Sequence, residues 1–350
     1  EDDVVSTETD WTEAFSLEPE NPEVDTEKLD GFAEVYQGKP ITSHEICIDG
    51  SYADLSLEGL YSPDSPILRT GIFSGIREQL ARKGLLDRAD TYFRNSCEWM
   101  WRIRKFTFEK LRAADRVAGF DFLGDINTHG HTFGYSVGMM DEFYRLKPGE
   151  TIENVRRYNS ATVILSDLGS DFNVLAGCGK SVSFRVSNYQ DDMPDAKLTV
   201  SLVNGDGAIV WSEERCVGSV TNGCVSDVGA FSVPVPMGDS VQKYRLTVVI
   251  AGGTVRAENL WELYAFPDCA EPERPVGVRV EVQMTREDLL SAMGRGERVL
   301  LLGSRPFKTH PIGSDLPVAV PAIMRRFSSR RIPFSTVCQM KGGADGSSAA

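Results

Sequence analysis

The sequence predicts a mixed α/β segment, then an all-β sandwich, then a short second α/β unit. Three observations support this fold class. Between residues 39 and 149 an extended run is followed by two helical patterns and another extended run, which is the order typical of a parallel sheet or barrel. Residues 150–267 contain short alternating runs separated by turns, and residues 276–304 contain a single strand–helix–strand pattern.

The length and composition are those of a globular protein with more than one domain. The chain has 350 residues, and a typical domain has roughly 100–200. Apolar residues make up 41% and charged residues 25% of the chain, as in ordinary globular proteins. No stretch approaches the ~20 apolar residues that span a bilayer, so the sequence predicts no membrane span.

Residues 1–38 form an acidic segment that we predict to be partly disordered. Residues 1–30 contain twelve acidic side chains and one basic side chain, that of Lys28. Many charges and few apolar groups cannot offset the entropy that ordering would cost. The net charge of -14 also argues against nucleic acid as a partner, because phosphate backbones bind basic surfaces.

The segment 39–149 is predicted to be the α/β part. An extended run covers 40–46, and a helical pattern that begins at 73 is broken by Gly84. A longer helix with an apolar side is predicted for 89–112, and the next strand for 119–125.

The segment 150–267 is predicted to be an immunoglobulin-like β-sandwich. Seven short strands with turns between them are typical of that fold. Asn204 and Gly205 begin a hairpin turn, since both residue types tolerate a positive φ. The seven runs are 161–166, 180–188, 197–203, 208–213, 229–235, 241–251 and 256–266.

The segment 276–304 is predicted to be a partial α/β domain. Strands at 278–282 and 298–302 flank a helix at 285–293, and Thr285 and Asp288 resemble the start of a capping box. Regular patterns are lost after residue 304, and the end of the chain is small and polar. We therefore predict a disordered tail for 305–350.

The seven cysteines include no CxxC pair, so neither a zinc ribbon nor a disulfide framework is indicated. Cys216 and Cys224 are close enough in sequence to bridge a loop in an oxidising compartment. Free and mostly buried thiols are the favoured interpretation.

The sharpest candidate for chemistry is Ser43-His44-Glu45, at the end of a predicted strand. A carboxylate in this position is able to attack an anomeric carbon and form a glycosyl-enzyme, if a second carboxyl group about 5 Å away protonates the leaving oxygen. Taken alone, a Glu after a strand is more often an ordinary surface or capping residue. Glu45 is the candidate nucleophile, and His44 is a candidate substrate-binding residue.

A second polar cluster follows the next predicted strand and consists of Asp125, Asn127, His129 and His131. In a barrel these side chains would lie beside Glu45, because the carboxyl ends of parallel strands meet at one mouth. The two histidines have no third ligand at a familiar spacing. Binding of sugar hydroxyls and simple loop structure are the favoured interpretations, and we predict neither a metal nor a cofactor.

The residues Lys39-Pro40-Ile41-Thr42-Ser43-His44-Glu45-Ile46 resemble the seventh barrel strand of glycoside hydrolase family 2, the β-galactosidase, β-glucuronidase and β-mannosidase group. In that strand of the family a Glu is the nucleophile. Residues 119–125 are similar to the eighth strand, and residues 150–267 to the sandwich that follows the barrel in a subgroup found in gut bacteria. The resemblance covers 39–303 and implies the end of a (β/α)8 TIM barrel.

The sequence departs from the family at two points. Ile46-Cys47-Ile48 follows Glu45, where the family has small or aromatic residues and glycine. The family's acid/base Glu follows an Asn, and no Asn-Glu dipeptide occurs in the 350 residues. Because a retaining mechanism needs both carboxyl groups, we expect these residues alone to be inactive.

The resemblance therefore implies a fragment of a retaining, exo-acting β-glycosidase that acts on terminal β-linked sugars. β-Galactosidase-like specificity is favoured, although the strand-end residues do not distinguish galactose from glucuronic acid or mannose. No Lys or Arg lies between Asn127 and Phe143 to bind a uronate carboxylate, which argues mildly against a glucuronide. We expect a periplasmic or secreted protein with a carbohydrate as its partner, and predict no oligomeric state. The alternatives are a non-catalytic carbohydrate-binding or cell-surface module built on the sandwich, and a structural pseudoenzyme.

Overall fold

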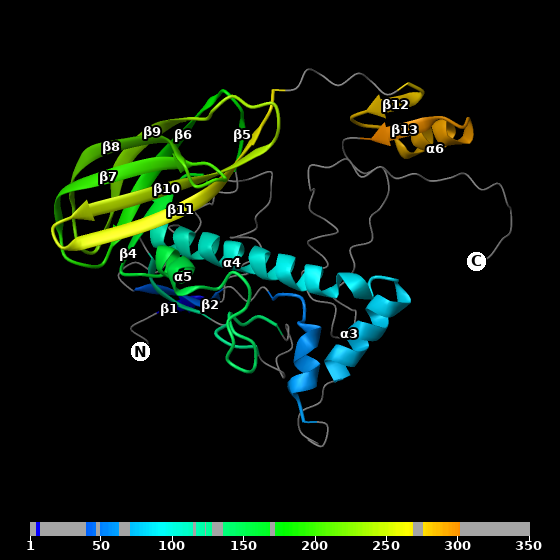
Figure 1. Cartoon of the computed structure of the whole chain (residues 1–350), viewed down its shortest axis with the longest axis horizontal. Helices are drawn as coiled ribbons and strands as arrows, with labels where there is room; N and C mark the ends of the chain where they lie inside the picture. The colour runs from blue at the N-terminus through cyan, green and yellow to red at the C-terminus, as the bar shows by residue number, and fades with distance from the viewer. Residues whose placement is uncertain are drawn as a thin grey trace. The chain divides into compact units, whose positions relative to one another are not determined.

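The structure is a computed structural model that describes residues 5–7, 40–46, 50–62, 71–114, 117–122, 124–127, 136–168, 172–268 and 276–301. Contacts divide the chain into one unit that ends at Asp268 and another that begins at Cys269, and each is described by itself. The first unit contains a small parallel sheet, several helices and the sandwich (Figure 1). The predicted boundary between 149 and 150 falls inside this unit and stays a prediction.

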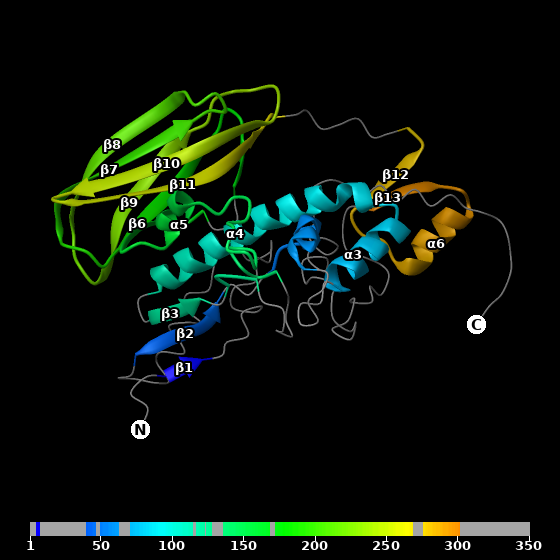
Figure 2. The same ribbon diagram turned by 60° about the horizontal axis from the view of Figure 1, so that its bottom comes forward.

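The parallel sheet consists of strands β1 (Val5–Thr7), β2 (Ile41–Ile46) and β3 (Val117–Phe122). They are paired in the order β1-β2-β3, and both pairings are parallel. Figure 2 shows the three strands side by side. Strand β1 lies within the acidic segment 1–38, where the β-branched residues Val5 and Thr7 favour a strand and the edge of β2 supplies a partner.

Helix α4 (Ala89–Ala113) confirms the predicted long helix and extends it by one residue. It is preceded by the 3-10 helix η1 (Leu55–Leu60), helix α3 (Gly71–Arg82) and the 3-10 helix η2 (Leu86–Arg88). Gly84 follows α3 with a φ of 66°, which explains why the first helical pattern stops there. The buried side of α4 has a period near 3.6 residues and includes Phe93, Cys97, Met100, Ile103, Arg104, Phe108 and Leu111.

The parallel sheet packs against α4 and the short helix α5 (Ile152–Tyr158). The Phe108 ring makes edge contacts with the Phe120 and Tyr158 rings, at centroid distances of 4.9 and 5.1 Å. Such edge-to-face pairs add about 0.5–1.5 kcal/mol beyond the burial of their surface. Phe120 of β3 and Ile46 of β2 thus belong to one hydrophobic cluster with Phe108 and Tyr158.

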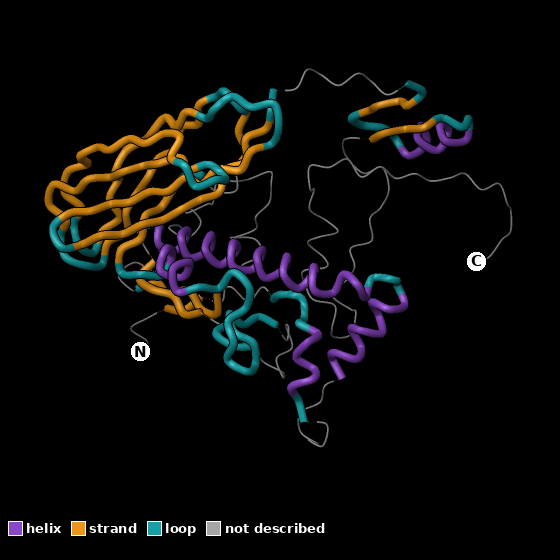
Figure 3. Tube along the Cα trace, viewed as in Figure 1, coloured by secondary structure: helices purple, strands orange, loops and turns teal. Residues whose placement is uncertain are grey.

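The sandwich has two layers, antiparallel except for the pair β5–β11, as Figure 3 shows in orange. One sheet has the order β5-β11-β10-β7-β8 and the other the order β4-β6-β9. The strands are β4 (Thr162–Ser166), β5 (Asn173–Leu175), β6 (Gly179–Asn188), β7 (Met193–Val203), β8 (Ile209–Val220), β9 (Cys224–Pro234), β10 (Gln242–Gly252) and β11 (Val255–Phe266).

The seven predicted sandwich strands are confirmed, and β5 is an eighth that the pattern missed. Three residues are too few to show alternation, and β5 pairs in parallel with β11. The predicted hairpin turn is also present, since the Gly207 amide donates to the Asn204 carbonyl at 3.1 Å. An immunoglobulin-like topology stays a prediction.

The sandwich is joined to α4 by a buried polar network centred on Glu109. Its carboxylate accepts hydrogen bonds from Lys105, from Asn259 at 2.6 Å and from the Trp261 indole at 3.3 Å. The Lys105 ammonium also lies over the Trp261 ring, 4.4 Å from its centroid. Asn259 is fully buried and donates as well to the Ile164 carbonyl of β4 at 2.7 Å. The two parts therefore share buried charged and polar groups.

The second unit contains strand β12 (Val278–Glu281), helix α6 (Arg286–Gly294) and strand β13 (Arg298–Leu301). The two strands pair in parallel, which confirms the predicted strand–helix–strand unit. The Thr285 side chain accepts from the Asp288 amide at 3.1 Å and caps the helix. The predicted disordered tail at 305–350 lies outside the described residues.

Four cysteines lie in the described residues, and all carry free thiols. Cys216 and Cys224 are therefore not bridged. Cys97 is buried, whereas Cys178, Cys216 and Cys224 are exposed, so the expectation of mostly buried thiols is wrong for this part of the chain. None of the described helices is long and apolar enough to cross a membrane.

Candidate functional site

The pairing of β2 with β3 shifts register between Ile41 and Thr42 and again, in the manner of a β-bulge, between Ser43 and Ile46, at the candidate nucleophile. Ser43 pairs with Phe120 and Ile46 with Phe122, so that His44 and Glu45 lie against one residue of β3, Asp121. Bulges redirect side chains and are common next to active sites. The backbone of Glu45 is thus described, whereas the side chains of His44 and Glu45 are outside the described part of the structure.

The segment after β3 forms a short ladder with residues 138–140. The Met140 amide donates to the Asp125 carbonyl at 2.9 Å, and the Asn127 amide donates to the Met140 carbonyl at 3.0 Å. Gly138 fits between these strands because a Cβ there would lie 2.3 Å from the Asn127 nitrogen. The Asp125 side chain is exposed and the Asn127 side chain is buried.

The Asn127 amide is engaged within the protein. It donates to Glu142 Oε2 at 3.0 Å and accepts from the Gly138 amide at 3.2 Å. The Tyr61 hydroxyl donates to Glu142 Oε1 at 2.5 Å, and burial, followed by this hydrogen bond, raises the pKa of Tyr61. These contacts give Asn127 a structural role that strand-end reasoning did not predict.

Asn127→Ala is expected to lower the free energy of unfolding by about 1–3 kcal/mol, because the buried Gly138 amide loses its acceptor and Glu142 loses a donor. Chemical denaturation measures this change through the midpoint. Gln79→Ala, at an exposed position of α3, is the control and should change the free energy by less than about 0.5 kcal/mol. A neutral effect of Asn127→Ala would contradict the structural role.

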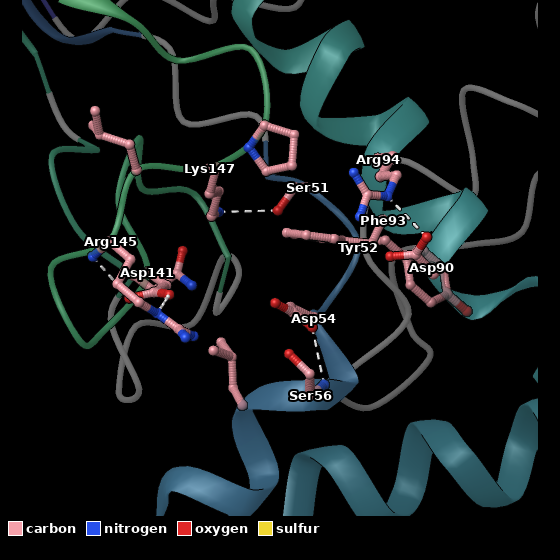
Figure 4. A pocket seen from close by; sticks show the side chains of 14 residues that line it. Ser51, Tyr52, Asp54, Ser56, Asp90, Phe93, Arg94, Asp141, Arg145 and Lys147 are labelled. Carbon is pink, nitrogen blue, oxygen red and sulfur yellow. Dashed lines mark hydrogen bonds and ion pairs between the residues drawn. The ribbon is translucent and has the colours of Figure 1, made fainter.

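A pocket of about 340 Å³ lies where the segments after β2 and β3 meet α4 (Figure 4). Small-molecule sites are typically clefts of about 300–1,000 Å³, so the pocket is at the small end of that range. Figure 4 shows Asp141 and Arg145 on one side and Asp90 and Arg94 on the other. Its lining is Ser51, Tyr52, Asp54, Ser56, Leu57, Asp90, Phe93, Arg94, Asn127, Asp141, Arg145, Leu146, Lys147 and Pro148.

Most charges in the pocket wall are already paired. Arg94 Nε lies 2.8 Å from an Asp90 carboxylate oxygen, and Arg145 Nε lies 2.7 Å from one of Asp141. The Asp54 carboxylate accepts from the Ser56 amide at 2.9 Å and caps η1. The pocket is therefore polar and close to neutral overall.

Lys147 connects the two strand-end segments. Its ammonium donates to Ser51 Oγ at 2.9 Å and to the Ser136 carbonyl at 2.8 Å. The Ser51 amide donates to the Ser136 carbonyl at 2.9 Å, and Ser136 Oγ donates to the Ser51 carbonyl at 2.6 Å. All three side chains are buried. The segment that follows β2 is thus held to the segment that follows β3.

A buried ion pair lies next to Lys147 and joins Arg104 of α4 to Glu150. Both side chains are only 1% exposed. The Arg104 guanidinium also lies over the Phe122 ring of β3, 5.1 Å from its centroid. Burial raises the pKa of Glu150, and Arg104 opposes that shift. The pair links the helix, the sheet and the loop that carries Lys147.

The structure brings together some of the predicted site residues. Glu45 and the segment of Asp125 and Asn127 lie at the same edge of the parallel sheet, and Asn127 also lines the pocket. His129 and His131 lie outside the described residues. In the described part of the chain, no three His, Cys, Asp or Glu side chains form a group able to hold a metal.

Sequence reasoning missed Ser51, Arg145 and Lys147 as pocket residues. The stretch between Asn127 and Phe143, which contains no Lys or Arg, ends two residues before Arg145. The only signal was the pair of basic residues, Arg145 and Lys147, that follows soon after the second polar cluster. Their convergence with Ser51 depends on contacts between distant segments.

Comparison with known proteins gives a family profile and several solved structures. The profile is described as a domain of unknown function, DUF8488, and matches residues 180–267, which run from β6 to the end of β11. No curated protein matches the chain.

The solved structures include glycoside hydrolases, all at low similarity. Spo0M, a sporulation control protein from Bacillus subtilis, is 14% identical with a TM-score of 0.23, and the match covers 32% of this chain and 51% of Spo0M. A Bacteroides uniformis β-glucuronidase is 14% identical with a TM-score of 0.24, and the match covers 40% of this chain and 17% of the β-glucuronidase. A family 123 glycoside hydrolase from Clostridium perfringens is 9% identical with a TM-score of 0.22, and the match covers 35% of this chain and 29% of the hydrolase.

These matches span about half or less of each of the three proteins. The profile covers only the strands β6–β11 of the sandwich. The comparisons assign the chain to no family of known activity.

Proposed function

We propose that the chain is part of a retaining β-glycosidase that removes terminal β-linked sugars from oligo- or polysaccharides, with β-galactosidase-like specificity. Glu45 is the nucleophile. The observation that carries the proposal is the β-bulge at His44 and Glu45, at the carboxyl end of a parallel strand. Chemistry in parallel α/β barrels takes place at this edge, and a bulge there turns side chains away from the regular strand.

The segments after β2 and β3 support the proposal, because both contribute polar groups at the same edge. Asp125 is exposed there, and with His44, His129 and His131 it is proposed to bind sugar hydroxyls. Asn127 orders the segment after β3 through Gly138 and Glu142. We further propose that β2 and β3 are the last two strands of a (β/α)8 barrel.

In the proposed reaction, Glu45 attacks the anomeric carbon as the bond to the leaving oxygen breaks, and a second carboxyl group gives that oxygen a proton. Water then attacks the glycosyl-enzyme, and the second carboxylate takes its proton. The resemblance places this acid/base Glu after an Asn, and the 350 residues contain no such pair. We propose that it belongs to another part of the protein.

The test compares the 350 residues alone with the longer product of the same reading frame, using a nitrophenyl β-galactoside. The residues alone should release no nitrophenol, and the longer product should release it. Glu45→Gln in the longer product should reduce hydrolysis to background, whereas Glu78→Gln, at an exposed position of α3, should not.

Chemical rescue separates a nucleophile from a residue that only supports the fold. Glu45→Ala with added azide should form the α-glycosyl azide, because azide then attacks from the face that Glu45 has vacated. If the 350 residues alone hydrolysed the substrate, and Glu45→Gln abolished that activity, no carboxyl group from outside these residues would be needed. Full activity of Glu45→Gln in the longer product would overturn the assignment of the nucleophile.

A further inference from the structure

Lys147 is a buried lysine whose ammonium makes no hydrogen bond to a carboxylate in the described part of the structure. Its side chain is 4% exposed, and its two acceptors are the neutral groups Ser51 Oγ and the Ser136 carbonyl. A buried lysine without a paired anion is destabilised in its charged form. The neutral amine is a nucleophile toward carbonyl carbons.

The groups around Lys147 also favour its neutral amine. Burial is the main cause that lowers the pKa of Lys147 to about 8, and Arg104 of α4 lowers it further. Cys97, Glu142 and Glu150 oppose this shift. Glu150 is already engaged with Arg104, and burial raises the pKa of the Cys97 thiol to about 11, so that this thiol is neutral near pH 8.

Lys147 also lines the pocket of about 340 Å³. Figure 4 shows its amine directed to Ser51, between Tyr52 and the segment that carries Arg145. The surrounding wall contains hydroxyl and carboxylate groups from Tyr52, Ser56 and Asp54. These groups suit a short, hydroxylated molecule better than an apolar one.

We propose that Lys147 is an imine-forming site for small hydroxylated aldehydes, the chemical class that includes open-chain sugars. The neutral amine attacks the aldehyde carbon, a C–N bond forms, and the carbonyl oxygen takes up a proton while the nitrogen gives one up. The resulting carbinolamine loses its oxygen as water and becomes a C=N bond. One aldehyde and one amine thus give one imine and one water, with no oxidant or reductant. The proposal does not depend on Glu45.

The experiment uses the 350-residue chain, glycolaldehyde as the probe and cyanoborohydride to reduce any imine to a stable amine. Peptide mass spectrometry then measures the adduct at each lysine. At pH 8 the adduct at Lys147 should form at least about tenfold faster than on free Nα-acetyl-lysine, because a lysine side chain in water, with a pKa near 10.4, is less than about 1% neutral at that pH. Exposed Lys83 serves as the comparison within the chain. The rate at Lys147 should have its midpoint near pH 8, and that of Nα-acetyl-lysine in the same tube near 10.4.

The preference for Lys147 must depend on the folded pocket. Guanidinium should abolish it, and this comparison needs no variant that folds. Lys147→Arg keeps the charge and a hydrogen-bond donor but should lose the fast adduct. The proposal would be overturned if Lys147 in the folded chain were labelled no faster than Lys83, or if the midpoint of its labelling rate lay above about pH 10. Lys147 would then be a structural ammonium. Neither outcome bears on glycoside hydrolysis.

Discussion

Glu150→Gln is expected to lower the free energy of unfolding by about 3–5 kcal/mol, because it removes the carboxylate from a buried ion pair. The Arg104 guanidinium, 1% exposed, would lose its charged partner and would have to remain buried or move the loop at Glu150. Chemical denaturation should show a lower midpoint with an unchanged slope. Since the pair lies beside Lys147, the same variant should also loosen the pocket.

Asp90→Asn is the matched control, since Asp90 lies on α4, the helix that carries Arg104. The Arg94–Asp90 pair has nearly the same type of contact, at 2.8 Å, but its side chains are 64% and 71% exposed. Exposed pairs contribute about 0–1 kcal/mol, so this variant should leave the midpoint almost unchanged. Equal effects of Glu150→Gln and Asp90→Asn would show that the buried pair is not held as described.

Glu109→Gln is expected to have a similarly large effect, about 3 kcal/mol or more. The change leaves the Lys105 ammonium, whose side chain is 10% exposed, without a nearby anion, and removing one partner of a buried pair is strongly destabilising. Hydrogen exchange should show faster exchange in both α4 and β11, because Asn259 and Trp261 of β11 also donate to Glu109.

Glu98→Gln provides the control, because the Glu98 side chain on the same helix is 54% exposed where it meets Arg102. It should have little effect on exchange in β11. If the amides of β11 were equally protected from exchange in Glu109→Gln and in the unmodified chain, the sandwich would be stable without its contacts to α4. That result would favour the alternative in which the sandwich is an independent carbohydrate-binding module.

The fold was predictable where burial is periodic along a long element. Strand β10 alternates buried and less buried side chains from Tyr244 to Ile250, and α4 buries one side over 25 residues. Strands β1 and β5 were not predictable, because each has three residues. Both owe their existence to a partner strand from a distant part of the chain.

The site was predictable only in outline. Polar residues that follow successive parallel strands predicted that Glu45 and Asn127 belong to one edge of a sheet. The sequence did not reveal that the Asn127 amide is engaged by Gly138 and Glu142. Nor did it bring together Ser51 and Lys147, because their contact arises from the tertiary path of the chain rather than from any local pattern.

The bulge at His44 and Glu45 makes strand β2 one residue longer than β3 over the paired stretch between Ser43 and Ile46. Deleting His44 would remove the register shift between Ser43 and Ile46, and the backbone pairing would gain regularity at that point. A shortened chain of this kind should therefore fold at least as well as the original, while the position of the carboxylate shifts by one place along the strand. Scanning β2 with single-residue deletions should therefore find that a deletion at this point preserves stability but abolishes function. Such a result would show that the extra residue is retained for a reason other than stability.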